Sequence, residues 1–128
     1  MDKRRKPTAQ RLAGLMTLAP GWANPDTGSG EPIHVDSYHE ALRLVEQIER
    51  NSLIVQRVMP RQNGGINLEW DFPECEIEVV VEIDPPPEET LYMTIYDGST
   101  TTVSPEDANH WSPSIDFIIN TIRKYSYF

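Results

Sequence analysis

The stretch GGINLEWDFPECEIEVVVEI, residues 64–83, decides the fold of this chain. Apolar side chains alternate with polar ones over residues 66–71 and again over residues 75–83, which is the pattern of two half-buried β-strands. The inward-facing set is Ile66, Leu68, Trp70, Cys75, Ile77, Val79, Val81 and Ile83. The outward-facing set is Asn67, Glu69, Asp71, Glu76, Glu78, Val80 and Glu82. We therefore expect two adjacent strands, joined at Phe72-Pro73-Glu74, that display carboxylates on one face with no Lys or Arg among them.

Two further stretches extend this sheet. The segment LIVQRVMP, residues 53–60, is rich in β-branched side chains, and Asn63-Gly64-Gly65 after it favours a hairpin because these residues accept positive φ. The segment TLYMTIYDG, residues 90–98, alternates again, and TTTV, residues 100–103, follows its Asp-Gly turn signal. Its inward residues are Leu91, Met93 and Ile95, and its outward residues are Tyr92, Thr94 and Tyr96. The order of these segments predicts an antiparallel meander of four to five strands.

An N-terminal helix is expected in the segment TAQRLAGLMTLAPGW, residues 8–22, with Thr8 as its cap and Pro20-Gly21 as its stop. Its apolar stripe, at helical spacing, is Leu12, Leu15, Met16 and Ala19. Residues 21–36 are rich in Gly, Pro, Asp and Ser and are predicted to form a loop. We expect Trp22 and Ile33 to anchor this loop to the core.

Two more helices are predicted, over residues 37–50 and 112–124. Ser37 and the Glu three residues later form a capping box at the start of the first, and Ser112-Pro113 is a typical start for the second. Helices before and after a meander indicate an α+β fold in which the helices cover the apolar face of the sheet.

The chain has the length of one domain, at 128 residues. We expect residues 1–11 to be a flexible basic tail and residues 12–128 to be a single α+β domain. Cys75 is the only cysteine, which excludes an internal disulfide and Cys-based zinc sites and favours a reducing, cytoplasmic compartment. No apolar run approaches the roughly 20 residues of a membrane span, and the basic start lacks the apolar stretch of a secretory signal.

The net charge of −9 is unevenly distributed. Residues 1–11 hold five basic side chains against Asp2, so the remaining residues carry −13. Residues 62–122 contain 13 acidic side chains and no Lys or Arg. A body this acidic repels nucleic acid and attracts a basic protein surface, so nucleic-acid contact is expected only through the Lys3–Arg11 tail.

The sequence contains no strong signal for catalysis or metal binding. Strand carboxylates two residues apart, such as Glu76 and Glu78, form an open array and not the pocket that acid/base catalysis needs. His34 and His39 lack the spacing that places two ligands on one helix face, and the acidic neighbours of Cys75 do not activate a thiol. We therefore expect no catalytic residue, no metal site and no cofactor.

The displayed carboxylates are the candidate site, together with two tyrosines on the same predicted face. The candidate partner-binding residues are Glu69, Asp71, Glu76, Glu78, Glu82, Tyr92 and Tyr96. Glu69 near Glu76 or Glu78 would put like charges on neighbouring strands, which destabilises a sheet. Such charges could either bind a partner protein or keep the sheet from stacking against other sheets. The two tyrosines favour a binding role, because Tyr is enriched at protein interfaces.

Several short stretches resemble a group of small bacterial proteins. They are GW at 21–22, PI at 32–33, ALRLVEQI at 41–48, VMP at 58–60 and GGINLEWDFPECEIEVVVEI at 64–83. The resemblance covers roughly residues 12 to 96, and its most specific part is Gly-Gly-Ile-Asn-Leu-Glu-Trp. The group often has Asp-Gly after the Gly-Trp, where this chain has Ala-Asn.

The resemblance implies a bacterial or phage-borne α+β domain, and the group has no assigned activity. It implies structural roles for Trp22, Gly64, Gly65 and Trp70: the two glycines shape the hairpin and Trp70 anchors the core.

The leading hypothesis is a non-catalytic protein-interaction module, in its sharpest form an acidic inhibitor or antitoxin-like neutraliser of a basic partner protein. One alternative is a small metal-dependent binder or enzyme that uses sheet carboxylates and a histidine. Another is nucleic-acid contact through the basic N-terminal tail. An uncovered edge strand or the aromatic C-terminus could also support a homodimer.

Overall fold

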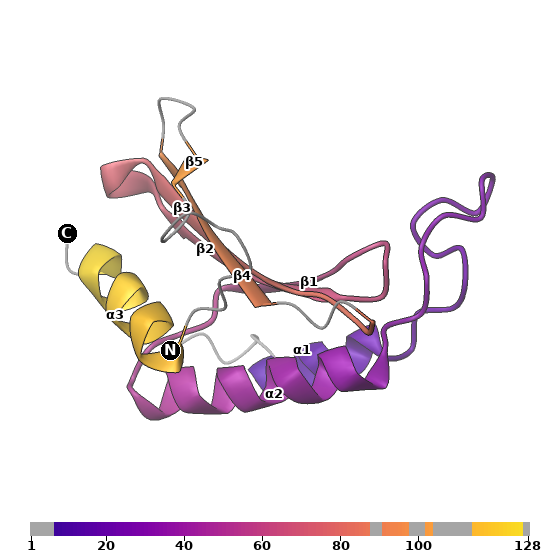
Figure 1. Ribbon diagram of the computed structural model, residues 1–128, viewed down its shortest axis with the longest axis horizontal. Coiled ribbons are helices and arrows are strands. Elements are labelled where there is room, and N and C mark those ends of the chain that lie inside the picture. The colour runs from indigo at the N-terminus through magenta and orange to yellow at the C-terminus, as the bar shows by residue number, and fades with distance from the viewer. Residues whose placement is uncertain (1–6, 88–90, 98–101, 104–113, 127–128) are drawn as a thin grey trace.

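The computed structural model describes residues 7–87, 91–97, 102–103 and 114–126 (Figure 1). Its elements in chain order are α1 (Thr8–Leu15), α2 (Val35–Arg50), β1 (Arg57–Pro60), β2 (Ile66–Phe72), η1 (Pro73–Cys75), β3 (Ile77–Ile83), β4 (Leu91–Asp97), β5 (Thr102–Val103) and α3 (Ile115–Ser126). Residues 1–6 of the predicted basic tail, which was expected to span residues 1–11, lie outside the described residues, as do His110, Ser112 and Pro113.

The five strands form one antiparallel meander in the order β1-β2-β3-β4-β5. Each hairpin joins neighbouring strands, so the predicted α+β meander with helices at both ends is confirmed. In Figure 1 the sheet is seen nearly edge-on, and α1, α2 and α3 all lie on the same side of it. The opposite face carries the polar half of the alternating pattern.

The core lies between the sheet and these helices. Its most deeply buried large side chains include Leu12, Leu44, Ile48, Ile66, Leu68, Trp70, Met93, Ile118 and Ile122. Trp70 is only 1% exposed, and its indole N–H donates a hydrogen bond of 2.7 Å to the carbonyl of Ile54. Burial of each such side chain stabilises the fold by about 1.5–3 kcal/mol, so the helical stripes and the inward strand residues together hold the two layers.

The β1–β2 turn depends on two glycines for different reasons. Gly64 has a φ of +90°, which L side chains rarely adopt, whereas Gly65 packs directly against β3. A Cβ on Gly65 would lie 2.3 Å from the carbonyl oxygen of Ile83. The turn therefore packs closely against the end of β3. This contact brings Arg61 and Asn63 within reach of Glu82 and Asp84.

The start of the second predicted strand is wrong by two residues. Pro73–Cys75 form the short 3-10 helix η1, and Glu76 caps it in the left-handed region with a φ of 56°. Pro73 favours this turn because its fixed φ suits the first position of a helix and it has no N–H for a strand ladder. Cys75 and Glu76 therefore lie in the β2–β3 connection and not on β3.

The N-terminal helix differs from its prediction at both ends. Thr8 is buried inside α1 and does not cap it; its hydroxyl donates to Glu49 and accepts from Arg11. Arg11 also donates to the carbonyls of Val55 and Gln56, so it belongs to the folded domain, and the predicted domain start at residue 12 is too late. The helix ends at Leu15, before the predicted Pro-Gly stop.

Both other helix starts use a different residue from the predicted one. The Nδ1 atom of His34 accepts the N–H of Asp36 at 3.1 Å and caps α2, which begins at Val35. Ser37, the predicted cap, is buried in the first turn, and its hydroxyl has no hydrogen-bond partner among the residues that the structure describes. In α3 the hydroxyl of Ser114 accepts the N–H of Phe117 at 3.1 Å.

Candidate protein-binding surface

The sheet face opposite the helices carries six of the seven predicted partner-binding residues. The registers pair Asp71 with Glu78, Asn67 with Glu82, Glu78 with Tyr96 and Glu82 with Tyr92. Directly paired residues of neighbouring strands share a face, and residues two apart on one strand do so as well. The predicted partner-binding residues on this face are Glu69, Asp71, Glu78, Glu82, Tyr92 and Tyr96, and they share it with Asn67, Val80 and Thr94. Glu76 is separated from them by its position in the connecting turn.

Two arginines that the sequence analysis did not connect to this face neutralise part of it. Arg57 on β1 is paired with Glu69 on β2, and its Nε lies 3.2 Å from the carboxylate. The Glu69 side chain is 17% exposed, so this pair is partly shielded from water. Glu69 itself stands opposite Val80, and the predicted clash with Glu76 or Glu78 directly across the strands does not occur.

Arg61 in the β1–β2 turn is the centre of a second polar cluster on the same face. Its Nη1 donates to Asn67 at 3.1 Å and lies 3.5 Å from a carboxylate oxygen of Glu82. Its Nε lies 3.4 Å from Asp84, which also accepts a hydrogen bond from Asn63. Arg61 therefore neutralises part of the charge of Glu82 and Asp84. Because all three side chains are partly buried, these two carboxylates contribute little negative charge to the outer surface.

The opposite end of this face keeps its negative charge. Asp71 and Glu78 stand directly opposite each other on β2 and β3, and the turn between these strands adds Glu74 and Glu76. We call these four residues the acidic corner. Asp71, Glu74 and Glu76 are exposed and Glu78 is partly exposed. Within the part of the chain that the structure describes, none of the four carboxylates forms an ion pair.

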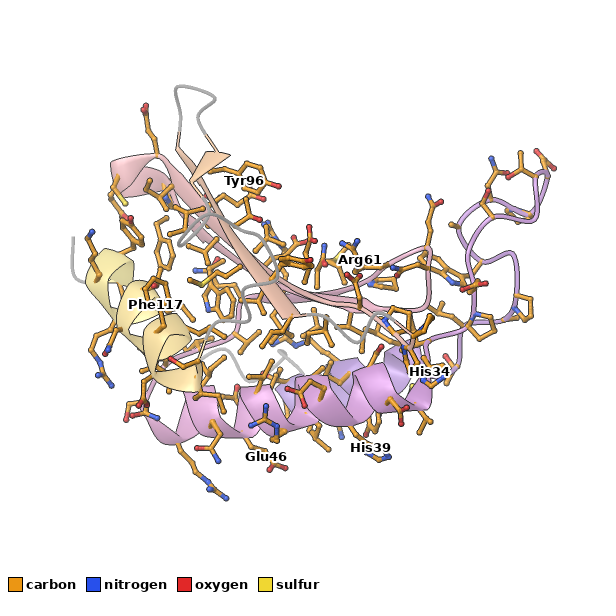
Figure 2. All side chains as sticks on the ribbon, in the orientation of Figure 1. His34, His39, Glu46, Arg61, Tyr96 and Phe117 are labelled. Atoms are coloured by element: carbon orange, nitrogen blue, oxygen red, sulfur yellow. The ribbon has the colours of Figure 1, made fainter. Side chains whose placement is uncertain are left out.

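An exposed aromatic ring adjoins the acidic corner. Tyr96 on β4 is the cross-strand partner of Glu78 and is 41% exposed, and Figure 2 shows it near the β5 end of the sheet, away from Arg61. Val80 at the middle of the face is 6% exposed, so the centre is covered by its neighbours. The most accessible end of the predicted face therefore presents Asp71, Glu78 and Tyr96, and the turn that adjoins it adds Glu74 and Glu76.

The remaining polar candidates are dispersed. His34 is engaged as the cap of α2, while His39 lies exposed on that helix, and Figure 2 places both far from Tyr96. Cys75 donates a weak hydrogen bond to the carbonyl of Phe72. In the described residues, no three side chains of His, Cys, Asp or Glu come together in a way that could hold a metal ion.

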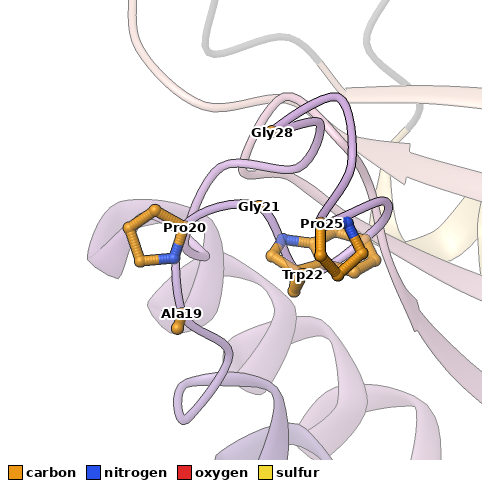
Figure 3. Close-up of a pocket in the computed structure, with 6 residues that line it drawn as sticks. All are labelled: Ala19, Pro20, Gly21, Trp22, Pro25 and Gly28. Carbon is orange, nitrogen blue, oxygen red and sulfur yellow. The ribbon is translucent and has the colours of Figure 1, made fainter.

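The loop between α1 and α2, part of which was predicted at residues 21–36, carries a second feature that the sequence analysis did not predict. Residues 16–34 project from one end of the molecule in Figure 1, and we call them the arm. Figure 3 shows a hollow in the arm, with a volume of about 460 Å³, lined by Ala19, Pro20, Gly21, Trp22, Pro25 and Gly28. Trp22 is only half-buried there, so it does not anchor the loop to the core as predicted, whereas Ile33 does.

Comparisons of this chain with protein-family models, with curated proteins and with solved structures find no match. The resemblance to a group of bacterial proteins therefore stays a prediction, and any function must be inferred from geometry and charge. Among the described residues, no helix has both the length and the apolar character needed to cross a membrane.

Proposed function

We propose that this protein is a non-catalytic interaction module that binds a basic surface of a partner protein through its acidic corner. The observation that supports it most directly is the register that sets Asp71 opposite Glu78, with Glu74 and Glu76 in the adjoining turn. Like charges directly opposite each other in a sheet are destabilising by a few tenths of a kcal/mol or more. A partner that brings Arg or Lys side chains to this corner relieves that repulsion on binding.

The contrast within one sheet face strengthens the proposal. Glu69 and Glu82 form ion pairs with Arg57 and Arg61, whereas none of the four corner carboxylates forms an ion pair in the described part of the chain. A patch of four like charges raises the local concentration of oppositely charged partners and speeds their association. Tyr96 adds an exposed ring of the type that is enriched at protein interfaces.

The class of partner follows from this chemistry. Proteins that bind nucleic-acid phosphates do so with basic surfaces, so an acidic inhibitor or antitoxin-like neutraliser of such a protein is the sharpest form of the proposal. The single cysteine and the resemblance described above support a bacterial or phage-borne protein that acts in the cytoplasm.

The test is to co-purify the partner with the tagged full chain and to measure its affinity for charge variants. The double variant Glu74→Gln with Glu76→Gln and the single variant Glu74→Lys each raise the net charge by two. Glu46→Lys makes the same change at an exposed position of α2, remote from the corner in Figure 2, and is the matched control.

We expect the two corner variants to weaken binding by about tenfold at low salt, with the difference shrinking as salt screens the charges. The control should keep its affinity within about twofold, because only local charges contact the partner. Equal losses for all three variants would show that net charge alone governs binding and would refute the corner. Calorimetric titration with Mg²⁺, Mn²⁺, Ca²⁺ and Zn²⁺ separates the metal-dependent alternative, since tight saturable binding of any of them would contradict the proposal.

A further inference from the structure

The arm is a built structure with its own hydrogen bonds. The carbonyl of Ser29 accepts the N–H groups of Ala23 and Asn24, and the N–H of Gly21 donates to Gly30 at 2.8 Å. The two sides of the arm are thereby closed into a narrow hairpin, with an isolated bridge between Asn24 and Ser29. The hollow at Trp22 is therefore formed by backbone that is held in place.

The position of the Trp22 ring is fixed from two directions. Its indole N–H donates to the carbonyl of Glu31 at 2.6 Å. Gly30 lies so close to the ring that a Cβ there would be 3.0 Å from the Trp22 Cε2 atom. The ring is one wall of the hollow, which it shares with the prolines Pro20 and Pro25. Because the indole N–H is already used, the ring offers a ligand its π surface and not its hydrogen bond.

The surroundings of the hollow are acidic. Asp26 directly follows Pro25 in the turn that leads to Gly28, and Asp26 and Glu31 are both exposed. Residues 12–42 contain no Lys or Arg, so the arm itself has no basic group to pair with them. The hollow is thus apolar at its walls and aromatic on one side, and the exposed Asp26 directly follows its Pro25 wall, whereas the carboxylate of Glu31 lies beside Gly64 of the β1–β2 turn.

We propose that the hollow of the arm receives a lysine or arginine side chain from an extended basic segment of a partner protein. The aliphatic stem of such a side chain packs on proline and tryptophan surfaces while its charged head stays hydrated. The cation is attracted by the π face of Trp22 and by the carboxylate of Asp26.

Two other occupants fit less well. A polyproline segment docks into aromatic grooves, but here the prolines belong to the wall and the indole N–H that could bind a peptide carbonyl is occupied. A purely aliphatic side chain could fill the hollow, but it would bring no positive charge to the carboxylate of Asp26. The proposal is independent of the acidic corner, because the two features lie at opposite ends of the long axis in Figure 1.

The experiment is a nuclear magnetic resonance titration of the full ¹⁵N-labelled chain. The probes are the capped peptides acetyl-(Gly-Arg)₃-amide and acetyl-(Gly-Lys)₃-amide, and the control peptide replaces each arginine with citrulline, which is nearly isosteric and uncharged. The readouts are the indole N–H signal of Trp22 and the backbone amides of Ala23 and Gly28. The indole signal of Trp70 reports that each variant is folded.

We expect both basic peptides to shift the arm signals saturably, with the citrulline peptide binding at least about fivefold more weakly. Trp22→Leu should abolish the shifts in Ala23 and Gly28, and Asp26→Asn should weaken them about threefold at low salt. The corner variant Glu74→Gln with Glu76→Gln should leave them unchanged, which separates failure of this proposal from failure of the proposed function. Equal binding of the citrulline peptide, or shifts confined to residues outside the arm, would overturn the assignment. If Trp22→Leu does not fold, Asp26→Asn decides the question.

Discussion

Replacing Gly65 by Ala should lower the free energy of unfolding by about 2–3 kcal/mol, because the turn that carries Arg61 is seated on β3 at this residue. The added Cβ would lie 2.3 Å from the carbonyl oxygen of Ile83, 3.0 Å from Oδ1 of Asn63 and 3.2 Å from Cδ of Arg61. Ordinary contact begins at 3.4 Å, so the turn and the end of β3 must separate by roughly 1 Å. Ile83 on β3 pairs with Ile66 at the start of β2. Moving the turn away from β3 therefore strains this pair, which lies at the open end of the β2–β3 hairpin.

Urea unfolding followed by circular dichroism measures the effect. With a slope of about 1.5 kcal/mol per molar urea, the midpoint should fall by roughly 1.3–2 M. Gly14→Ala is the matched control, since a Cβ there meets nothing within 4 Å and Ala is the better helix former. That variant should gain about 0.5 kcal/mol. A Gly65→Ala midpoint equal to that of the parent would refute the close approach of turn and strand.

Four further substitutions test the surface, the core and the helix starts by the same urea assay. Glu78→Gln should stabilise the fold by about 0.5 kcal/mol at low salt, because it removes the like charge opposite Asp71. The gain should disappear at about 0.5 M NaCl, where salt screens the repulsion between exposed charges. Trp70→Phe should cost about 2–3 kcal/mol, because it creates a small cavity and removes the indole hydrogen bond to the carbonyl of Ile54; a loss below about 0.5 kcal/mol would contradict this reasoning. His34→Ala should cost about 1 kcal/mol because it removes the cap of α2, whereas Ser37→Ala should be neutral or slightly stabilising. A larger loss for Ser37→Ala than for His34→Ala would instead support Ser37 as the cap.

The strand faces could be predicted from the sequence because alternation needs no knowledge of which strands pair. Leu68 and Trp70 point to the core and Glu69 and Asp71 point away whatever residue of β3 lies opposite. The helical stripes behave similarly, as the burial of Leu44 and its neighbours on α2 shows. The order of the strands also followed, because short connections force consecutive strands to be neighbours.

The charge balance of the sheet could not be predicted in this way, because it depends on the register of β1 against β2. Arg57 lies 12 residues before Glu69 in the sequence, and only the hairpin register brings them together. Arg61 reaches Glu82 and Asp84 because Gly65 lets its turn sit against β3. The spacing of residues along the sequence does not show that either arginine lies close to these carboxylates. The face therefore looked uniformly acidic when only residues 64–83 were considered.

The helix starts were misplaced because competing caps lie within a few residues of one another. Ser37 and its Glu satisfy the capping-box pattern, yet His34 lies where the chain turns away from the β1–β2 loop, and its N–H donates to the carbonyl of Gly64. That tertiary hydrogen bond fixes His34 outside the helix and leaves its Nδ1 as the nearest acceptor for the N–H of Asp36. The choice of cap is thus made by the hairpin, through a contact that the local sequence does not contain.

The acidic corner and the arm occupy opposite ends of the long axis in Figure 1, and this separation decides how their partners can be distinguished. Residues this far apart, with no shared contacts, should contribute to binding independently. If one elongated basic partner contacts both ends, a variant that combines Glu74→Gln and Asp26→Asn should lose affinity by the product of the two single losses. If two partners are involved, each substitution should affect only one of them. Additivity on a single partner would therefore identify an extended basic surface, and strict separation would identify two independent contacts.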